Sequence, residues 1–369
     1  MSIDNANPKT KSAKDDVPNL LYTDVETEVS NTLRTMLGTH AAWQSVLART
    51  ESDQTTDTAL WKRIAVDQGL AGLAVPEELG GAGASWREVA VVCEELGRAT
   101  AQVPYLGSAV TATALLLELA ETDILGQLAT GEKIAAVVVP FSTAPGDAVN
   151  GSLSVSDGKI SGTVTSVADA LAADVLLVPT SEGLYAVDAA SAKRKGFMSL
   201  DMTRQLADIS FEGVTGTPVA DAAQVAPALQ KVLVLTSAML AADFTVFAYL
   251  GAVCGLAFII GSYQALKHRL ADVYVLVTQV RAAARYAAAC AGTDDSDLPI
   301  AASVAQAHAS YVAVKAAEEC LQMHGGIGFT WENQSHLFLK RAKADSIGLG
   351  RADQHRALLA GLVDLPPAS

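Results

Sequence analysis

The apolar residues of this 369-residue chain follow three successive patterns. Between residues 22 and 133 they recur at steps of three and four, which is the spacing of amphipathic helices. Between 134 and 224 they form short β-rich runs broken by Gly, Asp and Ser, and such runs predict strands. From 225 to 369 the helical spacing returns over longer stretches. We therefore predict a helical domain, a β domain and a helical bundle, preceded by a mobile polar tail over residues 1–21.

Local signals place individual elements within these parts. Ser85 and Glu88 have the spacing of a capping box, which predicts a helix that begins just after the Gly-rich loop 80–83. The predicted strands are 136–139, 153–155, 159–164, 174–178 and 184–187. Pro140 ends the first of them because proline has no backbone N–H to donate to a sheet. The spacing of the runs suits a small antiparallel barrel or sandwich between helical domains.

The apolar pattern of residues 225–369 predicts long antiparallel helices. One helix carries an apolar face made of Leu266, Leu270, Val273, Val277 and Val280. A second carries Val304, Ala307, Tyr311, Val314, Ala317 and Leu321 on one face. The acidic segment 293–297, which precedes Pro299, is their connection. Together these features predict an α+β protein whose carboxy-terminal part is a four-helix bundle.

Charge and cysteine usage narrow the class of protein. With 40 acidic and 26 basic residues the formal net charge is −14, which argues against binding to nucleic acid because phosphates would be repelled. The four cysteines lie far apart without metal-ligand spacing, so we expect buried thiols in a reducing cytoplasm and no metal site. The amino terminus lacks the basic and apolar regions of a signal peptide. We therefore expect a cytoplasmic protein.

A glycine-rich turn at residues 322–332 interrupts the alanine-rich helical pattern of the bundle. Glycine lets backbone N–H groups come close to a bulky anionic partner because no Cβ stands in the way. The turn is thus a candidate contact for a cofactor or phosphate. A plain helix end followed by a turn explains the same residues equally well.

The chain resembles the acyl-CoA dehydrogenase family. The resemblance rests on residues 261–345, which hold Gly-Ser-Tyr-Gln-Ala-Leu-Lys-His-Arg-Leu-Ala-Asp at 261–272 and the Gln-x-His-Gly-Gly-x-Gly-Phe turn. Further matches are residues 60–81, 94–98, 103–106, 172–174 and 200–204. The resemblance implies FAD as the cofactor, an acyl-CoA thioester as the substrate, and assembly as a dimer or dimer of dimers. In this family the turn lies against the adenine-diphosphate half of a flavin held mainly by the neighbouring subunit.

The resemblance also assigns site residues. Gln264, Gln322, Gly325 and Gly326 match the residues by which the family contacts its neighbour's flavin. The family's catalytic base is a glutamate, because a carboxylate must remove the α-proton of the thioester. In different members this glutamate comes from one of two places in the chain. Those places correspond to Leu349 and Thr236 here, and neither residue is acidic.

One carboxylate near these positions is a weak candidate for the missing base. Asp243 is the sole carboxylate between residues 232 and 266, and it lies two helical turns from Thr236, so roughly on the same helix face. A cap or a buried ion pair is the favoured role for Asp243. Glu94 and Glu95 are expected on a solvated helix face.

Two flavin-binding segments of the family are altered. The Arg-x-x-Phe-Gly run is replaced at residues 253–257, which removes a cation that would meet a pyrophosphate. The loop that usually reads Thr-Glu-Pro and then Gly-Ser-Asp is replaced at residues 140–147. Residues 244–263 carry no charge and contain Gly251-x-x-x-Gly255, so they satisfy the requirement for a membrane-spanning helix. The resemblance on both sides favours instead a helix buried at a subunit interface.

Three hypotheses follow from the sequence. The favoured one is a degenerate subunit that lends its turn to a flavin site shared with a catalytic, related acyl-CoA dehydrogenase chain. The second is a self-sufficient homo-oligomer that uses Asp243 or another base, and the third is a flavin-free scaffold. A membrane-anchored form ranks below these, and straight-chain, branched and sterol-derived thioesters all stay open as substrates.

Overall fold

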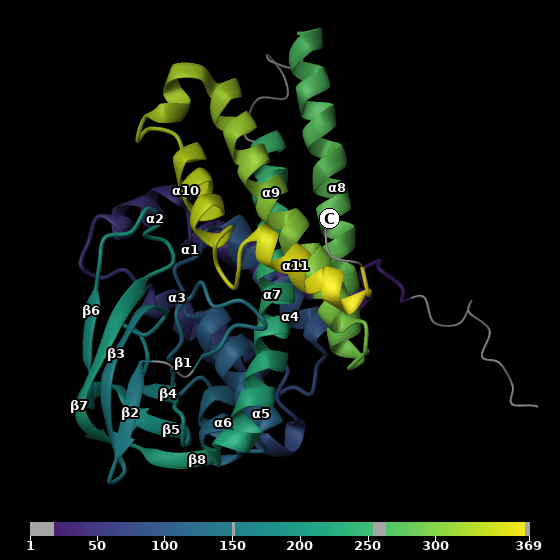
Figure 1. Ribbon diagram of the computed structural model, residues 1–369. Coiled ribbons are helices and arrows are strands. Elements are labelled where there is room, and N and C mark those ends of the chain that lie inside the picture. Colours follow the sequence, from purple (N-terminus) through teal and green to yellow (C-terminus); the bar gives the residue numbers. More distant parts are fainter. Residues whose placement is uncertain (1–17, 150–151, 254–262, 366–369) are drawn as a thin grey trace, which may run out of the picture.

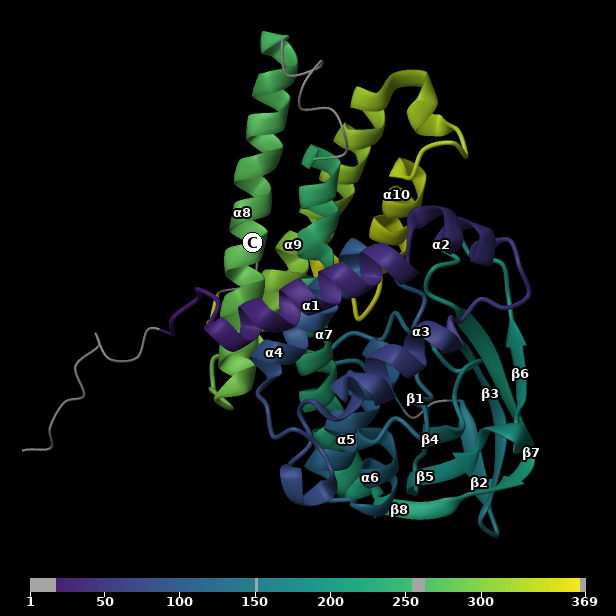
Figure 2. The same ribbon diagram turned by 180° about the vertical axis from the view of Figure 1, so that it is seen from behind.

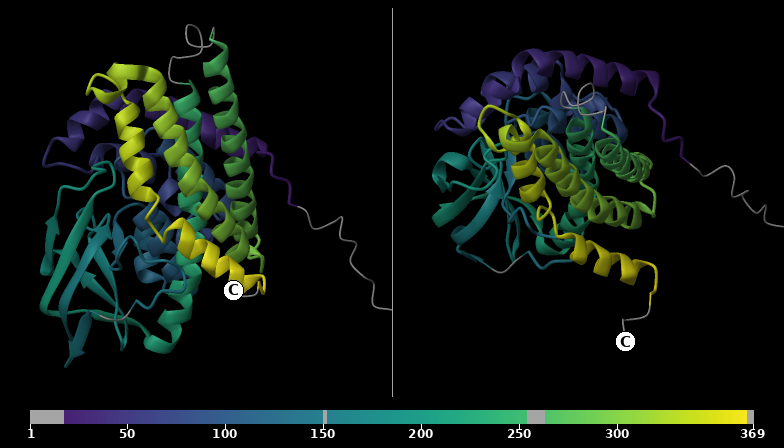
Figure 3. Two further views of the ribbon diagram at one scale, coloured as in Figure 1. Left: turned by 45° about the horizontal axis from the view of Figure 1, so that its top comes forward. Right: turned by 90° about the horizontal axis from the view of Figure 1, so that it is seen from above.

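The computed structural model describes residues 18–149, 152–253 and 263–365 (Figure 1). A helical part, a part with two β-sheets and a bundle of long helices follow one another along the chain. The α+β fold class predicted from the apolar pattern is confirmed. In Figure 3 the sheets lie beside the bundle, so the β domain packs against the side of the bundle.

The amino-terminal part consists of short helices around one core. Its α-helices are α1 (Asp24–His40), α2 (Trp43–Thr50), α3 (Thr58–Lys62), α4 (Trp86–Arg98), α5 (Thr113–Glu118) and α6 (Asp123–Ala129). Helical segments of 3₁₀ or π type are η1 (Arg63–Asp67), η2 (Leu70–Gly72), η3 (Glu77–Leu79) and η4 (Tyr105–Ala112). The predicted capping box begins α4: the Ser85 N–H donates to Glu88 Oε2 at 2.9 Å. Helix α1 crosses the back of the molecule (Figure 2).

Glu94 and Glu95 of α4 join three helices, and the expectation that they lie on a solvated face is wrong. Their side chains are buried, with 5% and 1% of the residue exposed. Glu95 forms ion pairs with Arg34 at 2.6 Å and with Arg98 at 3.1 Å, and Glu94 pairs with Arg281 of the bundle at 3.0 Å. Burial of carboxylates is tolerated here because each has a guanidinium partner.

The segment just before α1 is hydrogen-bonded to the folded body. The Arg87 guanidinium donates to the carbonyls of Asn19 and Leu21, and Arg285 donates to that of Leu20. These residues form the end of the predicted tail 1–21, whose residues 1–17 lie outside the described part. Backbone carbonyls of an extended segment therefore find their partners on α4 and on the bundle.

The β domain consists of two four-stranded sheets. Its elements are β1 (Ala135–Val137), β2 (Leu153–Ser156), β3 (Lys159–Ala168), β4 (Val175–Pro179), β5 (Gly183–Asp188), η5 (Ala189–Ser191), β6 (Lys193–Gly196), β7 (Leu206–Thr215) and β8 (Thr217–Asp221). The strand orders are β1-β4-β5-β8 and β2-β3-β7-β6. All pairs are antiparallel except β1 with β4, which is parallel, so the antiparallel expectation is wrong for that pair.

The carboxy-terminal part is the predicted bundle. Its helices are α7 (Ala222–Val253), α8 (Gln264–Gly292), α9 (Leu298–His324), α10 (Ser335–Asp345) and α11 (Ala352–Leu362), with the short segment η7 (Gly325–Phe329) after α9. On α8, Val273, Val277 and Val280 are buried as the spacing predicts. On α9, however, Val304 and Tyr311 are 41% and 54% exposed in this single chain, so that predicted face is only partly buried.

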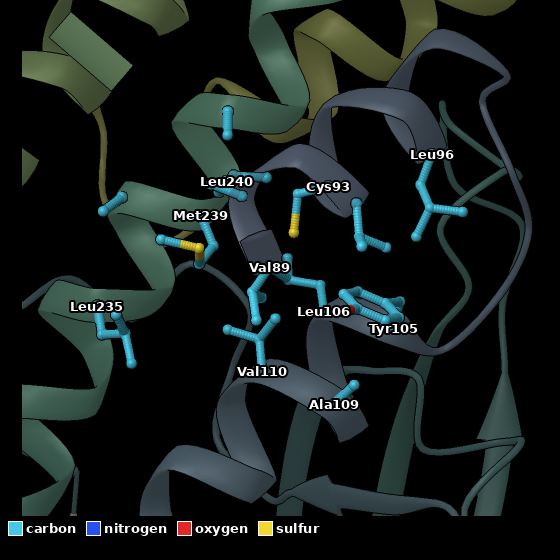
Figure 4. Close-up of a cluster of buried hydrophobic side chains, with 14 of the residues drawn as sticks. Val89, Cys93, Leu96, Tyr105, Leu106, Ala109, Val110, Leu235, Met239 and Leu240 are labelled. Carbon is cyan, nitrogen blue, oxygen red and sulfur yellow. The ribbon is translucent and has the colours of Figure 1, made fainter. Parts of the chain in front are cut away.

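The core of the molecule lies where the bundle meets the amino-terminal helices. Figure 4 shows Leu235, Met239 and Leu240 of α7 facing Val89 and Cys93 of α4, with η4 below them. Burying large apolar side chains from three elements in one cluster stabilises their mutual arrangement. It also fixes the position of α7, which carries Thr236 and Asp243.

Helix α7 begins with the one described helical segment that is long and apolar enough to cross a membrane. This segment is Ala222–Phe244, and 72% of its apolar window is buried within the chain. A helix covered by other protein elements on most of its surface is typical of a core helix. The altered family run at 253–257, apart from Val253, and residues 254–262 of the uncharged stretch 244–263 lie outside the described part.

Candidate functional site

The two family base positions meet in one small cavity. Thr236 from α7 and Leu349 from the loop after α10 line the same cavity of about 40 Å³. Its other walls are Leu106, Gly107, Thr111, Val137, Val139, Pro140, Phe141, Ala168, Asp169 and Leu233. Pockets that bind organic ligands usually measure about 300–1,000 Å³. A cavity of this size has room for only a few water molecules and is too small for a flavin ring or a thioester.

Phe141 occupies the space between the β domain and the loop after α10. Its N–H donates to the Ser166 carbonyl at 2.9 Å, and its own carbonyl accepts from the Leu349 N–H at 2.7 Å. A Cβ added to Gly348 would lie 2.5 Å from carbons of the Phe141 ring. Glycine at 348 is therefore what allows the ring to pack there. The replaced loop 140–147 and the loop 346–350 fit each other closely.

A second contact ties the replaced loop to α7. The Gly146 N–H donates to Gln230 Oε1 at 2.5 Å, and Gln230 Nε2 donates to the Asp147 carbonyl at 3.0 Å. On the other side, a Cβ on Gly350 would lie 2.6 Å from the Ala144 Cβ. Two hydrogen bonds from one side chain hold this part of the loop against α7.

Asp169 is the carboxylate that lines this cavity, and the sequence reading missed it. It follows β3 with a left-handed φ of +59°, and 8% of the residue is exposed. The Gly107 N–H donates to Asp169 Oδ2 at 3.0 Å, whereas Oδ1 has no hydrogen-bond partner among the described residues. Burial raises the pKa of this carboxyl, and Arg204 opposes the rise. Nothing in the local sequence distinguishes Asp169 from an ordinary turn residue, because its partner lies 62 residues earlier.

Asp243, the weak base candidate, lies in a different place. It does not line the cavity but belongs to a buried cluster of four charges, which we call the charge quartet: Arg204, Asp243, Arg341 and Asp345. Arg204 Nη2 is 3.0 Å from Asp243 Oδ2, and Arg341 Nη2 is 3.2 Å from the same oxygen. Two guanidinium groups thus share one carboxylate oxygen, which leaves Asp243 poorly placed to accept a proton from a substrate.

The quartet joins the β domain to two helices of the bundle. Arg204, which precedes β7, donates to both oxygens of Asp345 on α10, at 2.9 and 3.2 Å. Burial opposes ionisation of Asp345, yet the two arginines outweigh it and hold the pKa below its usual range. For Asp243 burial prevails over the same arginines, and its pKa is raised.

The predicted flavin contacts lie at the other end of the bundle. Gln264 begins α8, Gln322 ends α9, and Gly325 and Gly326 form the turn that follows; all four residues are exposed. A Cβ on Gly325 or Gly326 would meet nothing within 4 Å, so the backbone of the turn faces open space. None of the four lines the cavity. The open turn fits the contact surface for a group that another chain holds, whereas the cavity does not fit a flavin ring.

Comparisons with known proteins agree with this architecture. Residues 23–132 match the family model "Acyl-CoA dehydrogenase, N-terminal domain", and residues 257–362 match "Acyl-CoA dehydrogenase, C-terminal domain". The chain is 34% identical to acyl-CoA dehydrogenase IpdE2 of Mycolicibacterium smegmatis over 324 residues, which cover 86% of this chain and 92% of the relative. The chain therefore belongs to the acyl-CoA dehydrogenase family, whose members are generally FAD-dependent.

Two solved structures show the same fold. A Tcur3481–Tcur3483 steroid acyl-CoA dehydrogenase variant superposes with a TM-score of 0.81 at 25% identity, covering 92% of this chain and 98% of that one. The ChsE4–ChsE5 complex of Mycobacterium tuberculosis gives a TM-score of 0.82 at 21% identity, covering 95% and 100%. Each of these structures is named for two differently named chains.

Proposed function

We propose that this chain is a non-catalytic subunit of a flavin-dependent acyl-CoA dehydrogenase. It pairs with a related chain that carries the glutamate base and holds FAD, and it lends the turn around Gln322, Gly325 and Gly326, together with Gln264, to that flavin. The reaction of the assembly would be α,β-dehydrogenation of an acyl-CoA thioester. We place the assembly in the cytoplasm.

The observation that carries this proposal is the cavity shared by Thr236 and Leu349. A hydroxyl and a hydrocarbon side chain stand at the two positions from which the family supplies its base, and neither can accept a proton at neutral pH. Phe141 fills the space between the replaced loop and Leu349. The base that the chemistry requires is therefore missing from both family positions in this chain.

The charge of the cavity supports the same conclusion. Removing the α-proton develops negative charge on the thioester oxygen, and enzymes stabilise it with hydrogen-bond donors or cations aimed at that oxygen. The cavity is instead lined by the carboxyl group of Asp169, and no described lysine or arginine lines it. A carboxylate in that position would repel the developing charge rather than stabilise it.

The exposed surface next to the turn supports a partner chain. Ile327, Phe329 and Trp331 are 49%, 73% and 58% exposed within five residues. Large apolar and aromatic side chains gathered on one segment are typical of protein interfaces. The similarity to the Tcur3481–Tcur3483 and ChsE4–ChsE5 structures favours a related chain as that partner. The name of the first, a steroid acyl-CoA dehydrogenase, favours a sterol-derived thioester as the substrate class.

Coexpression tests the proposal. We expect the chain purified alone to be colourless, and the complex with its related chain to show a bound-flavin absorption band that bleaches when acyl-CoA is added. A lone chain that is yellow and bleaches would support the self-sufficient enzyme instead. A complex that stays colourless would support the flavin-free scaffold.

A pair of matched variants tests the role of the turn. Gly326→Ala and Gly361→Ala each add a methyl group to an exposed glycine whose surroundings are open within 4 Å. If the turn contacts the partner's flavin, Gly326→Ala in the complex should lower FAD retention while Gly361→Ala leaves it unchanged. Equal FAD retention in the two complexes would show that the turn does not contact the flavin.

A further inference from the structure

A second and much larger pocket lies on the opposite side of α7 from the small cavity. Its volume is about 500 Å³, within the range of pockets that bind organic ligands. It is enclosed by the end of α5, the first half of α7, the connection between α8 and α9, and α11, which crosses the bundle in Figure 1. Leu233 and Thr236 line the small cavity, whereas Lys231 and Val234 of the same helix line this pocket.

The walls of the pocket are apolar side chains that are only half-buried. They are Trp86 at the start of α4, Leu117 of α5, Val234 of α7, Leu298 and Pro299 of α9, and Leu358 of α11. Six such side chains from five elements present apolar surface to one concave space. Covering that surface with a ligand would remove it from water, which favours binding.

The charged groups that line the pocket are mostly acidic. Asp294 and Asp295 make no ion pair with any described residue, and the ammonium of Lys231 is already bonded to Glu118 at 3.0 Å. An anionic ligand would be repelled by these two carboxylates. Fatty acids, nucleotides and thioesters of coenzyme A are therefore poor ligands for this pocket.

We propose that this pocket binds an uncharged, largely hydrocarbon compound. A water molecule takes up about 30 Å³ in the liquid, so the volume corresponds to roughly seventeen waters and suits a ligand of about 12–20 non-hydrogen atoms. The ligand would contact Pro145 and Gly146, which belong to the loop that Gln230 holds over the small cavity. This site is separate from the proposed flavin contacts and does not depend on them.

Equilibrium dialysis of the full-length chain with two probes of matched size tests the ligand class. 2-Acetylnaphthalene is uncharged, and 2-naphthoate has the same ring system and the same number of non-hydrogen atoms but carries a negative charge. We expect saturable binding of 2-acetylnaphthalene at one site per chain and at least tenfold weaker binding of 2-naphthoate. Equal binding of the two probes, or no saturable binding of the neutral one, would overturn the proposal.

Variants locate the binding site. Val234→Trp places a large side chain in the pocket and should weaken 2-acetylnaphthalene binding at least tenfold. Leu117→Trp fills the pocket from α5 and should have the same effect, so it replaces the first variant if that one does not fold. Val304→Trp, an exposed valine outside the pocket, is the control and should bind as the unmodified chain does. Unchanged binding in both pocket variants, or loss of binding when the related chain is added, would show that the pocket is not a ligand site.

Discussion

Replacing Arg204 by methionine tests whether the charge quartet joins the β domain to the bundle. Arg204 makes three charged hydrogen bonds, at 2.9 and 3.2 Å to Asp345 and at 3.0 Å to Asp243. All four members of the quartet are buried. Methionine retains much of the side-chain volume but leaves two carboxylates with Arg341 as their remaining cationic partner.

The expected cost follows from the charges left behind. Breaking a buried ion pair by removing one partner typically costs about 3–5 kcal/mol, because the remaining charge stays desolvated. Proteins are stable by only about 5–15 kcal/mol, so this single change should remove at least about a fifth of the total. Arg204→Lys retains the charge but loses the bidentate hydrogen bonding of the guanidinium. The stability of this variant should lie between that of Arg204→Met and that of the unmodified chain.

Denaturant unfolding followed by circular dichroism measures the effect. The midpoint should fall strongly in Arg204→Met while the slope of the transition is retained. Arg351→Met removes an exposed pair with Asp353 whose side chains are 61% and 66% exposed, and it should produce no measurable shift. A cost below about 1 kcal/mol for Arg204→Met, or equal shifts in the two variants, would refute the reasoning.

Three further changes probe the closed cavity. Gly348→Ala places a Cβ 2.5 Å from the Phe141 ring, so calorimetry should show a loss of about 1–3 kcal/mol that largely disappears in a Phe141→Ala background. Burial raises the pKa of Asp169 above its unfolded value, so the stability that this carboxyl contributes is present below about pH 4 and is lost as the pH rises through the folded pKa. Asp169→Asn should therefore raise the melting temperature, relative to the unmodified chain, more at about pH 7.5 than at about pH 4; an equal difference at both pH values would contradict this. Leu349→Glu restores a carboxylate at a family base position but not the missing space, so the lone chain should still fail to bleach flavin or to form enoyl-CoA.

Elements whose signal is local were predictable from the sequence. The capping box of Ser85 and Glu88 spans only four residues, and the five β-rich runs that were predicted all appear as strands. β6 was missed because its sequence, Lys-Arg-Lys-Gly, contains no residue with a high β-sheet propensity. β7 was missed because its buried Ala207, Ile209 and Phe211 alternate with polar positions instead of forming an apolar run.

The site depends on contacts between distant parts of the chain, and such contacts leave no pattern in sequence. Resemblance could place Thr236 and Leu349 at the two base positions, but only the fold shows that Phe141 fills the space beside them. Asp243 has its partners 39 and 98 residues away, so its role in the quartet could not be derived from helix spacing. The volume of a cavity is set by every residue that lines it and cannot be obtained from any motif.

The count of flavins in the purified complex tests the central claim most directly. We expect that this chain has no room for the flavin ring, whereas the partner chain binds one FAD. The denatured complex should therefore release half as many FAD molecules as it contains acyl-CoA dehydrogenase chains. One FAD for every chain would mean that the cavity lined by Thr236, Leu349 and Phe141 opens to hold a flavin, and would contradict the account.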